Sequence, residues 1–188
     1  ESGAMNIAFQ LLVPGVNFDL SRAGKGVSNG WFFFSCYNTE QANTLLEVNA
    51  SQKDKDFIMA VNWKKAEEYL AAGKAKKWPC KYMHNTYSET SHSTTSTEMN
   101  EVMMLDTREL KDIIYFIPCP KSPHGCDVNP TGEYIVASGK LAAVIPVFSF
   151  KKIQDAIAAK SFEGEFDGVP IIKYEAALQE KKEKPGLG

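Results

Sequence analysis

The chain has 188 residues, enough for one domain with a sizeable core, and its 44% hydrophobic and 23% charged residues are ordinary for a globular protein. The formal net charge of −2 and the pI near 6.0 exclude a strongly basic protein, so neither nucleic acid nor an anionic membrane surface is expected as a partner. No run approaches the roughly 20 apolar residues of a membrane span, so we expect none in this segment.

Hydrophobic patterning predicts a mainly β chain with a few helices. Two helices are expected at 63–72, where apolar residues recur at helical spacing before Gly73, and at 150–160, and a short one is expected to end at Leu46. The Gly/Ser/Asn-rich segment 22–30 and the Ser/Thr-rich segment 88–97 predict loops. Strands are predicted at 7–13, 31–36, 57–61, 110–117, 142–148 and 169–174, and directly after Gly132.

Two details refine these strands. Four large residues in succession at 31–34 cannot share one face, so this strand is expected to be covered on both sides. Pro146 predicts an edge position or a bulge for the strand that contains it. The Lys/Glu-rich residues near the end predict a tail.

An internal repeat suggests the architecture. Val61-Asn62-Trp63-Lys64-Lys65 recurs 87 positions later, from 61 to 148, as Phe148-Ser149-Phe150-Lys151-Lys152, and an amphipathic helix follows each copy. A strand-rich unit repeated at such a period indicates blades of a β-propeller enlarged by insertions. Two to three blades fit this length.

The segment 121–141 contains the strongest candidate for a site. A loop stiffened by prolines carries His124, an Asn-Pro-Thr-Gly turn follows at 129–132, and an alternating strand comes next. A histidine at a strand start that faces a propeller channel suits copper, zinc or iron. The alternative, a hydrogen-bonded loop histidine, stays open. His84 and His92 lie in polar sequence and are expected to be solvated.

The other candidates are acidic residues and cysteines. Tyr37, Glu40, Asp54 and Asp56 supply oxygen ligands of the type that calcium prefers, against the alternative of a solvated acidic loop. No sequence motif of a known hydrolase or phosphate-binding loop is present, and a thiol nucleophile at Cys126 lacks an orienting acid. The cysteines form no CxxC pair, and we interpret them as buried hydrophobic side chains, with disulfides as the open alternative: Cys36, Cys80, Cys119 and Cys126.

Several motifs occur together in the order found in one known family. Pro123-His124-Gly125-Cys126, with Asn-Pro-Thr-Gly-Glu-Tyr at 129–134 and Gly-Lys-Leu at 139–141, resembles the segment from Asn-Pro-His-Gly-Cys to Gly-Lys-Leu of nitrous-oxide reductase. Further matches are Ser-Cys-Tyr-Asn-Thr-Glu at 35–40, Asp56-Phe57 and Gly-Leu-Gly at 186–188. The resemblance runs nearly end to end and is weakest at 74–112.

The resemblance implies a fold and an activity. The fold is part of a seven-bladed β-propeller, with residues 1–188 forming one propeller segment, repeat units at about 31–117 and 118–188, and the family's cupredoxin domain absent from this chain. The activity of the whole protein is reduction of nitrous oxide to dinitrogen and water in the periplasm during denitrification. The family is a homodimer, and its electrons come from a donor such as a small cytochrome or cupredoxin.

The resemblance also implies metals and their ligands. The family's tetranuclear copper-sulfide cluster is bound by seven histidines, of which His124 is one, and the cupredoxin domain carries a dinuclear copper site. The family's calcium ligands transfer to Tyr37, Glu40 and Asp56, and the last ligand, an asparagine in the family, is Ser122 here. A further carbonyl ligand falls near Val48 or Ala50. With one cluster histidine, this segment alone is not expected to be active.

Two alternatives remain open from the sequence. The first is a non-catalytic β-propeller scaffold that keeps the blade pattern without the metal site. The second is a binding module stiffened by calcium.

Overall fold

The computed structural model describes residues 7–38, 44, 56–88 and 91–184. Within 80–100 it describes the backbone only. The helix expected to end at Leu46 lies outside the described residues. The described chain is mainly β, as predicted. Its strands are β1 (Gln10–Leu12), β2 (Phe18–Ala23), β3 (Trp31–Cys36), β4 (Phe57–Asn62), β5 (Lys76–Ser88), β6 (Ser91–Asp106), β7 (Ile114–Pro118), β8 (Pro123–Val128), β9 (Tyr134–Gly139), β10 (Val144–Ser149), β11 (Phe162–Phe166), β12 (Val169–Ile172) and β13 (Leu178–Glu183). Its helices are the 3₁₀ turn η1 (Gly26–Ser28) and the α-helices α2 (Trp63–Ala71), α3 (Phe150–Ala158) and α4 (Tyr174–Ala177).

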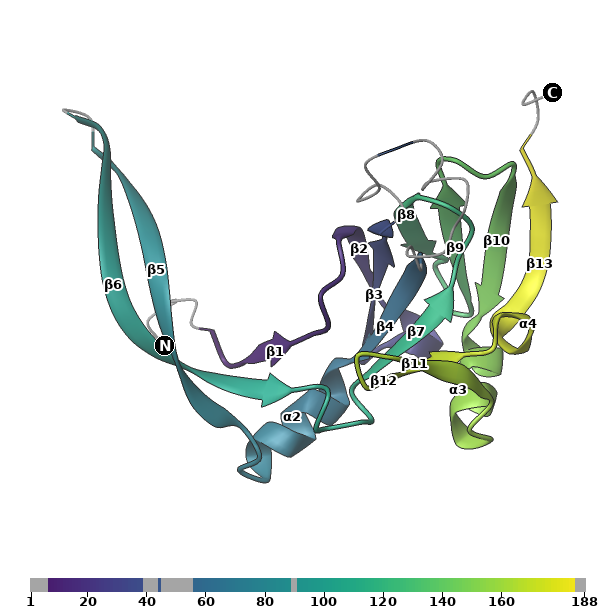
Figure 1. Cartoon of the computed structure of the whole chain (residues 1–188), viewed down its shortest axis with the longest axis horizontal. Helices are drawn as coiled ribbons and strands as arrows, with labels where there is room; N and C mark the ends of the chain where they lie inside the picture. The colour runs from purple at the N-terminus through teal and green to yellow at the C-terminus, as the bar shows by residue number, and fades with distance from the viewer. Residues whose placement is uncertain (1–6, 39–43, 45–55, 89–90, 185–188) are drawn as a thin grey trace.

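The strands form two main sheets and a projecting ribbon (Figure 1). The larger sheet has the order β11-β12-β7-β4-β3-β2, and the smaller has the order β13-β10-β9-β8. Within them, β2-β3-β4-β7 and β8-β9-β10-β13 are each four antiparallel neighbours. In both, the longest insertion falls between the third and the fourth strand: α2, β5 and β6 in one, and α3, β11, β12 and α4 in the other.

The internal repeat corresponds to two equivalent strand-to-helix junctions. In each, a six-residue strand passes directly into a nine-residue helix: β4 into α2 and β10 into α3. The Asn62 side chain accepts the Lys65 N–H at 3.1 Å, and the Ser149 side chain accepts the Lys152 N–H at 3.4 Å. Caps of this type stabilise a helix by about 1 kcal/mol each, so the repeated polar residue has a physical reason in both copies.

The hydrophobic core has two parts, one on each face of the larger sheet. Phe33 points into the space between the two main sheets, where it packs with Ile58, Ile135 and Phe148. Phe32 and Phe34 point to the opposite face, which β1, α2 and β6 cover. The expectation that the aromatic strand is covered on both sides is therefore confirmed.

The arm formed by β5 and β6 projects from the body of the protein (Figure 1). Its two strands pair along most of their length, from Lys76 opposite Met104 to Ser88 opposite Ser91, and β1 pairs in parallel with the base of β6. The prediction of a surface loop at 88–97 was therefore wrong for the described residues, which belong to β5 and β6. The serine and threonine residues there show no apolar alternation, which is the sequence signal of a half-buried strand. The prediction failed because backbone pairing forms this ribbon without that signal.

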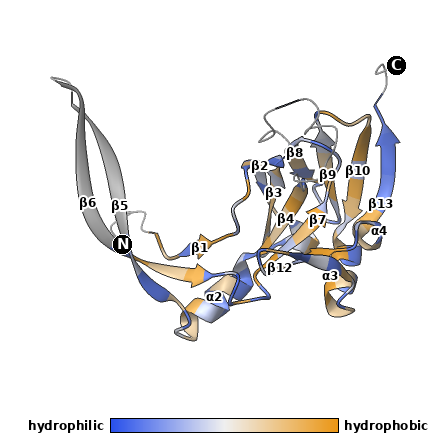
Figure 2. Cartoon of the chain, in the orientation of Figure 1, coloured by the Kyte–Doolittle hydropathy of each residue, from blue (hydrophilic) through white to orange (hydrophobic). Residues whose placement is uncertain are grey.

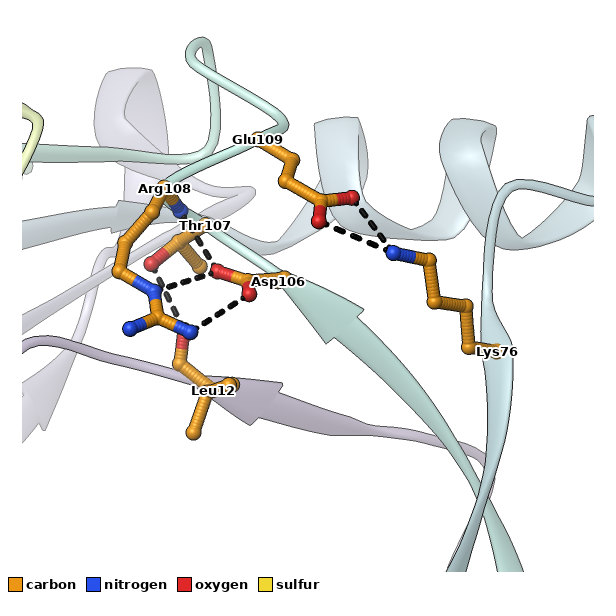
Figure 3. A network of polar contacts seen from close by, with 6 residues as sticks. All are labelled: Leu12, Lys76, Asp106, Thr107, Arg108 and Glu109. Carbon is orange, nitrogen blue, oxygen red and sulfur yellow. Dashed lines mark hydrogen bonds and ion pairs between the residues drawn. The ribbon is translucent and has the colours of Figure 1, made fainter.

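Polar contacts hold the base of this arm (Figure 3). Buried Thr107 donates both its N–H, at 3.1 Å, and its hydroxyl, at 2.8 Å, to the Leu12 carbonyl. The Asp106 carboxylate binds the Arg108 side chain at 2.9 and 2.8 Å, and Lys76 pairs with Glu109 at 2.7 Å. The Arg108 hydrogen bond lowers the pKa of Asp106. These contacts fix β1 and both strands of the arm to one another.

Other differences concern edge strands. β2 occupies part of the expected loop at 22–30, and β13 occupies the expected Lys/Glu-rich tail, which appears hydrophilic along the sheet edge (Figure 2). Charged residues are common on edge strands because they discourage pairing with other chains. Pro146 pairs with Lys181 of β13, and pairing of β10 with β9 begins at Val147. The register shifts between Val147 and Phe148, so the predicted bulge is confirmed although β10 is not an edge strand.

Candidate functional site

The candidate site lies where the two main sheets meet. β2 is the edge strand of the larger sheet, β8 is the edge strand of the smaller, and side chains connect them directly. Arg22 on β2 pairs with Asp127 on β8 at 2.7 Å, and Asp19 on β2 lies 2.8 Å from His124 on β8. The end of β3 and the start of β4 lie at the same junction.

His124 is the second residue of β8, so the histidine lies at a strand start as expected, but the stretch predicted as a proline-stiffened loop is itself a strand. Its ring stacks on Tyr37, with centroids 4.6 Å apart and planes 25° from parallel. Its Nδ1 lies 2.8 Å from an Asp19 carboxylate oxygen, and both side chains are 34% exposed. The imidazole is therefore held on one face and at one nitrogen while it stays partly open to solvent.

Asp56 contacts Ser122, which lies two residues before His124 in the chain. The Asp56 carboxylate, 6% exposed, accepts the Ser122 N–H at 2.7 Å, and its backbone carbonyl accepts the Cys119 N–H at 2.9 Å. Ser122 is fully buried and has a φ of 55°, a left-handed conformation that a serine adopts at some cost. The start of β4 thus fixes the backbone two residues before His124.

Tyr37 is positioned by the segment that precedes β2. Its N–H donates to the Asn17 carbonyl at 2.9 Å, and the Asn17 N–H donates to the buried Asn38 side chain at 2.8 Å. Of the predicted ligands, Tyr37, Asp56, Ser122 and His124 are therefore brought to one junction. Glu40 lies outside the described residues, as do Asp54, Val48 and Ala50.

Three cysteines lie at this junction, of which Cys36 and Cys126 are buried and Cys119 is partly buried. Cys36, Cys119 and Cys126 are free thiols, which agrees with their interpretation as buried hydrophobic side chains; the Cys80 side chain is not described. Burial raises the pKa of Cys36 and of Cys126 to about 12 and places that of Cys119 well above its ordinary value. The Cys126 thiol donates to the Phe33 carbonyl at 3.3 Å. A neutral, hydrogen-bonded thiol is a poor nucleophile, as the sequence suggested.

The structure tests whether these residues suit a metal. A histidine whose one nitrogen binds a carboxylate is the common arrangement of a metal-binding imidazole, so His124 and Asp19 fit a copper ligand. The buried Asp56 carboxylate, next to a turn, fits a hard cation. Among the described side chains, no group of three or more His, Cys, Asp or Glu residues is arranged to hold a metal. No described helix has both the length and the apolar character needed to cross a membrane.

Two predicted features lie elsewhere. His84 and His92, expected in loops, are on β5 and β6 of the arm, with the His84 backbone opposite Ser96. The residue that sequence reasoning missed is Asp19. Its strand was not predicted, although Phe18 and Leu20 alternate there with polar residues, and its partner is 105 residues away. No motif in the sequence around Asp19 signals this contact.

Comparisons with known proteins agree with the resemblance. No family model matches the chain. A nitrous-oxide reductase from Pseudomonas fluorescens is 25% identical over 161 residues, which cover 82% of this chain and 21% of that protein. One from Stutzerimonas stutzeri is 24% identical over 164 residues, covering 85% of this chain and 22% of that protein. The predicted resemblance to nitrous-oxide reductase is confirmed, and the chain spans about a fifth of the length of these relatives.

Proposed function

We propose that the chain is a segment of a copper-dependent nitrous-oxide reductase and supplies one histidine to its copper cluster. One observation carries this proposal: Tyr37, Asp56, Ser122 and His124, selected from sequence motifs, meet at one junction between two sheets. The four residues come from separate segments of the chain, and the fold places them together. The named relatives, both nitrous-oxide reductases, support the same conclusion.

In this proposal His124 is a ligand of the tetranuclear copper-sulfide cluster. When bound, the cluster supplies the electrons that reduce nitrous oxide to dinitrogen and water. The residues of this chain hold and orient one ligand: Tyr37 covers a face of the His124 ring, and the Asp56–Ser122 contact fixes the backbone before it. The remaining ligands come from other parts of the full-length protein, so the segment alone is not active.

The architecture supports a place in a β-propeller. The antiparallel sets β2-β3-β4-β7 and β8-β9-β10-β13 have the four strands of a propeller blade, and both carry their insertion at the same point. We assign them as two blades of a seven-bladed ring, within one propeller segment over 1–188. The first set begins at β2, before the repeat unit expected near 31–117, and the second set lies within the unit expected near 118–188. The first strands of the two sets, β2 and β8, would then line the channel, with His124 on β8.

Calcium is the second proposed metal. The Asp56 carboxylate, the Tyr37 carbonyl and Glu40 would bind it, with Ser122 in the place of the last ligand. If so, chelating calcium from the full-length protein will lower its melting temperature, and Asp56→Asn will lower it similarly and abolish the further effect of the chelator. An unchanged melting temperature after chelation would remove calcium from the proposal.

The remaining properties follow from the family. We propose a periplasmic homodimer that takes part in denitrification, with electrons entering through a dinuclear copper site in a cupredoxin domain outside this segment. The donor to that site is a small cytochrome or cupredoxin. Each of these properties belongs to the full-length protein.

The copper assignment is tested by replacing His124 in the full-length protein. His124→Ala should lower copper per chain and change the visible absorption of the copper cluster, because a ligand is lost. His84→Ala is the matched control, since its backbone lies on the projecting arm, away from the site. Retention of copper and of the cluster spectrum in His124→Ala would refute the proposal.

A non-catalytic propeller scaffold is the second candidate. The observation in its favour is that His124 already has a carboxylate and a stacked ring as protein partners, which also suits a purely structural histidine. In a scaffold, His124→Ala would lower stability while the full-length protein, before and after the change, would contain no copper.

A further inference from the structure

The contact between Asp19 and His124 joins the two sheets at the candidate site. Asp19 lies on β2 and His124 on β8, and the Asp19 Oδ2 atom is 2.8 Å from Nδ1 of the histidine. The two residues are 105 positions apart in the chain, so the fold and not local sequence produces the pair. Each side chain is 34% exposed, which leaves the pair accessible from the junction.

The chemistry of this pair decides which nitrogen carries the proton. An ionised carboxylate only accepts hydrogen bonds, so the bond to Asp19 requires a proton on Nδ1. In the neutral imidazole, the lone pair is then on Nε2, on the other side of the ring. Metal-binding histidines commonly donate their second nitrogen to a carboxylate, which fixes tautomer and ring orientation and raises basicity.

A second contact restrains the same ring. The Tyr37 ring stacks on the imidazole at 4.6 Å, so rotation of the His124 side chain would break both the stack and the bond to Asp19. Tyr37 is held in turn by the Asn17 carbonyl, close in sequence to Asp19. The segment that enters β2 therefore controls the ring from two directions.

We infer that Asp19 is the positioning residue for His124: its carboxylate holds the Nδ1–H tautomer and directs Nε2 toward copper. The inference rests on the proposed function, because it assumes that His124 binds copper. Asp19 contacts the histidine, and we do not propose it as a copper ligand. Loss of such a partner commonly lowers metal affinity or activity by about 10- to 100-fold.

The test compares Asp19→Asn with a matched variant of the same strand pair. Asp127 on β8 pairs with Arg22 on β2 at 2.7 Å, also across 105 positions. Asp127→Asn thus removes the same charge from the same junction. An effect on copper that appears in both variants would be structural.

Two readouts are measured on the metal-free full-length protein. The first is a titration with Cu(I) against a chromogenic chelator, from which the binding that depends on His124 is obtained by comparison with His124→Ala. Asp19→Asn should weaken that binding by about 10- to 100-fold, Asp19→Glu should restore most of it, and Asp127→Asn should leave it unchanged.

The second readout is the tautomer itself, which reports directly whether the Asp19 carboxylate sets the protonated nitrogen of the ring. With histidines labelled in ¹⁵N, the His124 signals are those absent from His124→Ala. They should report Nδ1–H in the wild type and in Asp127→Asn, and a shift toward Nε2–H in Asp19→Asn, because the amide can donate to Nδ1. If Asp19→Asn does not fold, Asp19→Ala is measured by the same criteria.

The outcomes separate this inference from the proposed function. If His124→Ala removes Cu(I) binding and Asp19→Asn leaves both binding and tautomer unchanged, the positioning role is refuted and the copper assignment stands. If His124→Ala leaves Cu(I) binding unchanged, the copper assignment fails, and the positioning role fails with it. Equal losses in Asp19→Asn and Asp127→Asn would also refute a specific role for Asp19.

Discussion

The Ser122 backbone donates a hydrogen bond to the Asp56 carboxylate at 2.7 Å, although 66 positions separate the two residues. Both are buried, and the bond joins the start of β4 to the segment that leads into β8. The two sheets are therefore tied together two residues before His124. The strength of this bond can be measured separately from any metal.

Removing the Asp56 carboxylate should destabilise the protein. Asp56→Ala leaves the Ser122 N–H buried without this acceptor, and a group of this kind costs about 1–3 kcal/mol. Asp56→Asn keeps an acceptor oxygen and should cost less. Urea unfolding in the presence of a calcium chelator measures both variants, and equal stability of Asp56→Ala and the wild type would contradict a structural role for the bond.

The Asn-Pro-Thr-Gly turn gives a prediction with a matched control. A Cβ at Gly132, where φ is 78°, would lie 1.7 Å from the Lys25 carbonyl oxygen. Gly73 has a similar φ of 68° with open space around it. Gly73→Ala should therefore cost only the free energy of holding an alanine in the left-handed conformation, about 1 kcal/mol. Gly132→Ala should cost at least about 2 kcal/mol because the backbone must also move.

Denaturant unfolding of both glycine variants distinguishes the two terms. A larger loss for Gly132→Ala shows that the turn packs against the η1 region, where Val27 donates to the Thr131 carbonyl. Equal losses in the two variants would mean that the close approach of Gly132 to Lys25 does not exist in solution.

How far the sequence predicts the fold depends on where each strand lies. Apolar patterning found β3, β4 and the helices α2 and α3 because each buries a face, as Phe33 and Phe57 do. It did not find β2 or β13, which lie at sheet edges and are stabilised mainly by backbone pairing with β3 and β10. Edge strands carry little pattern because little of their surface is buried.

The same limit applies to the candidate site. Motifs selected Tyr37, Asp56, Ser122 and His124, which the fold brings together at one junction. They did not select Asp19, because its contact with His124 joins the edge strands of two different sheets. Periodicity reports which face of a strand is buried, and it carries no information on which edges become neighbours.

The buried thiols predict how stability changes with pH. Burial raises the pKa of Cys126 from 9.0 to about 12, so above pH 9 the unfolded state loses a proton that the folded state keeps. The free energy of unfolding should therefore fall as pH rises from about 9 to 12, by up to about 1.4 kcal/mol per pH unit for each such thiol. Cys36 contributes in the same direction.

Urea unfolding between pH 8 and pH 10 measures this dependence. Cys126→Ala removes one of the thiols, so its stability should fall less steeply above pH 9 than that of the wild type. At pH 8 the described thiols should react slowly with iodoacetamide in the folded protein and rapidly in urea. A Cys126→Ala variant with the same pH dependence as the wild type would contradict the assigned pKa.

The final prediction concerns the base of the projecting arm. Thr107 is 1% exposed, and its hydroxyl donates to the Leu12 carbonyl that its own N–H also contacts (Figure 3). Thr107→Val keeps the shape and removes the hydroxyl, so it should cost about 1 kcal/mol and increase hydrogen exchange in β1. Arg108→Ala, which removes a partly exposed pair with Asp106, is the matched control and should leave exchange in β1 nearly unchanged. Faster exchange in the Arg108 variant than in the Thr107 variant would show that the ion pair, and not the Thr107 hydroxyl, stabilises the pairing of β1 with β6.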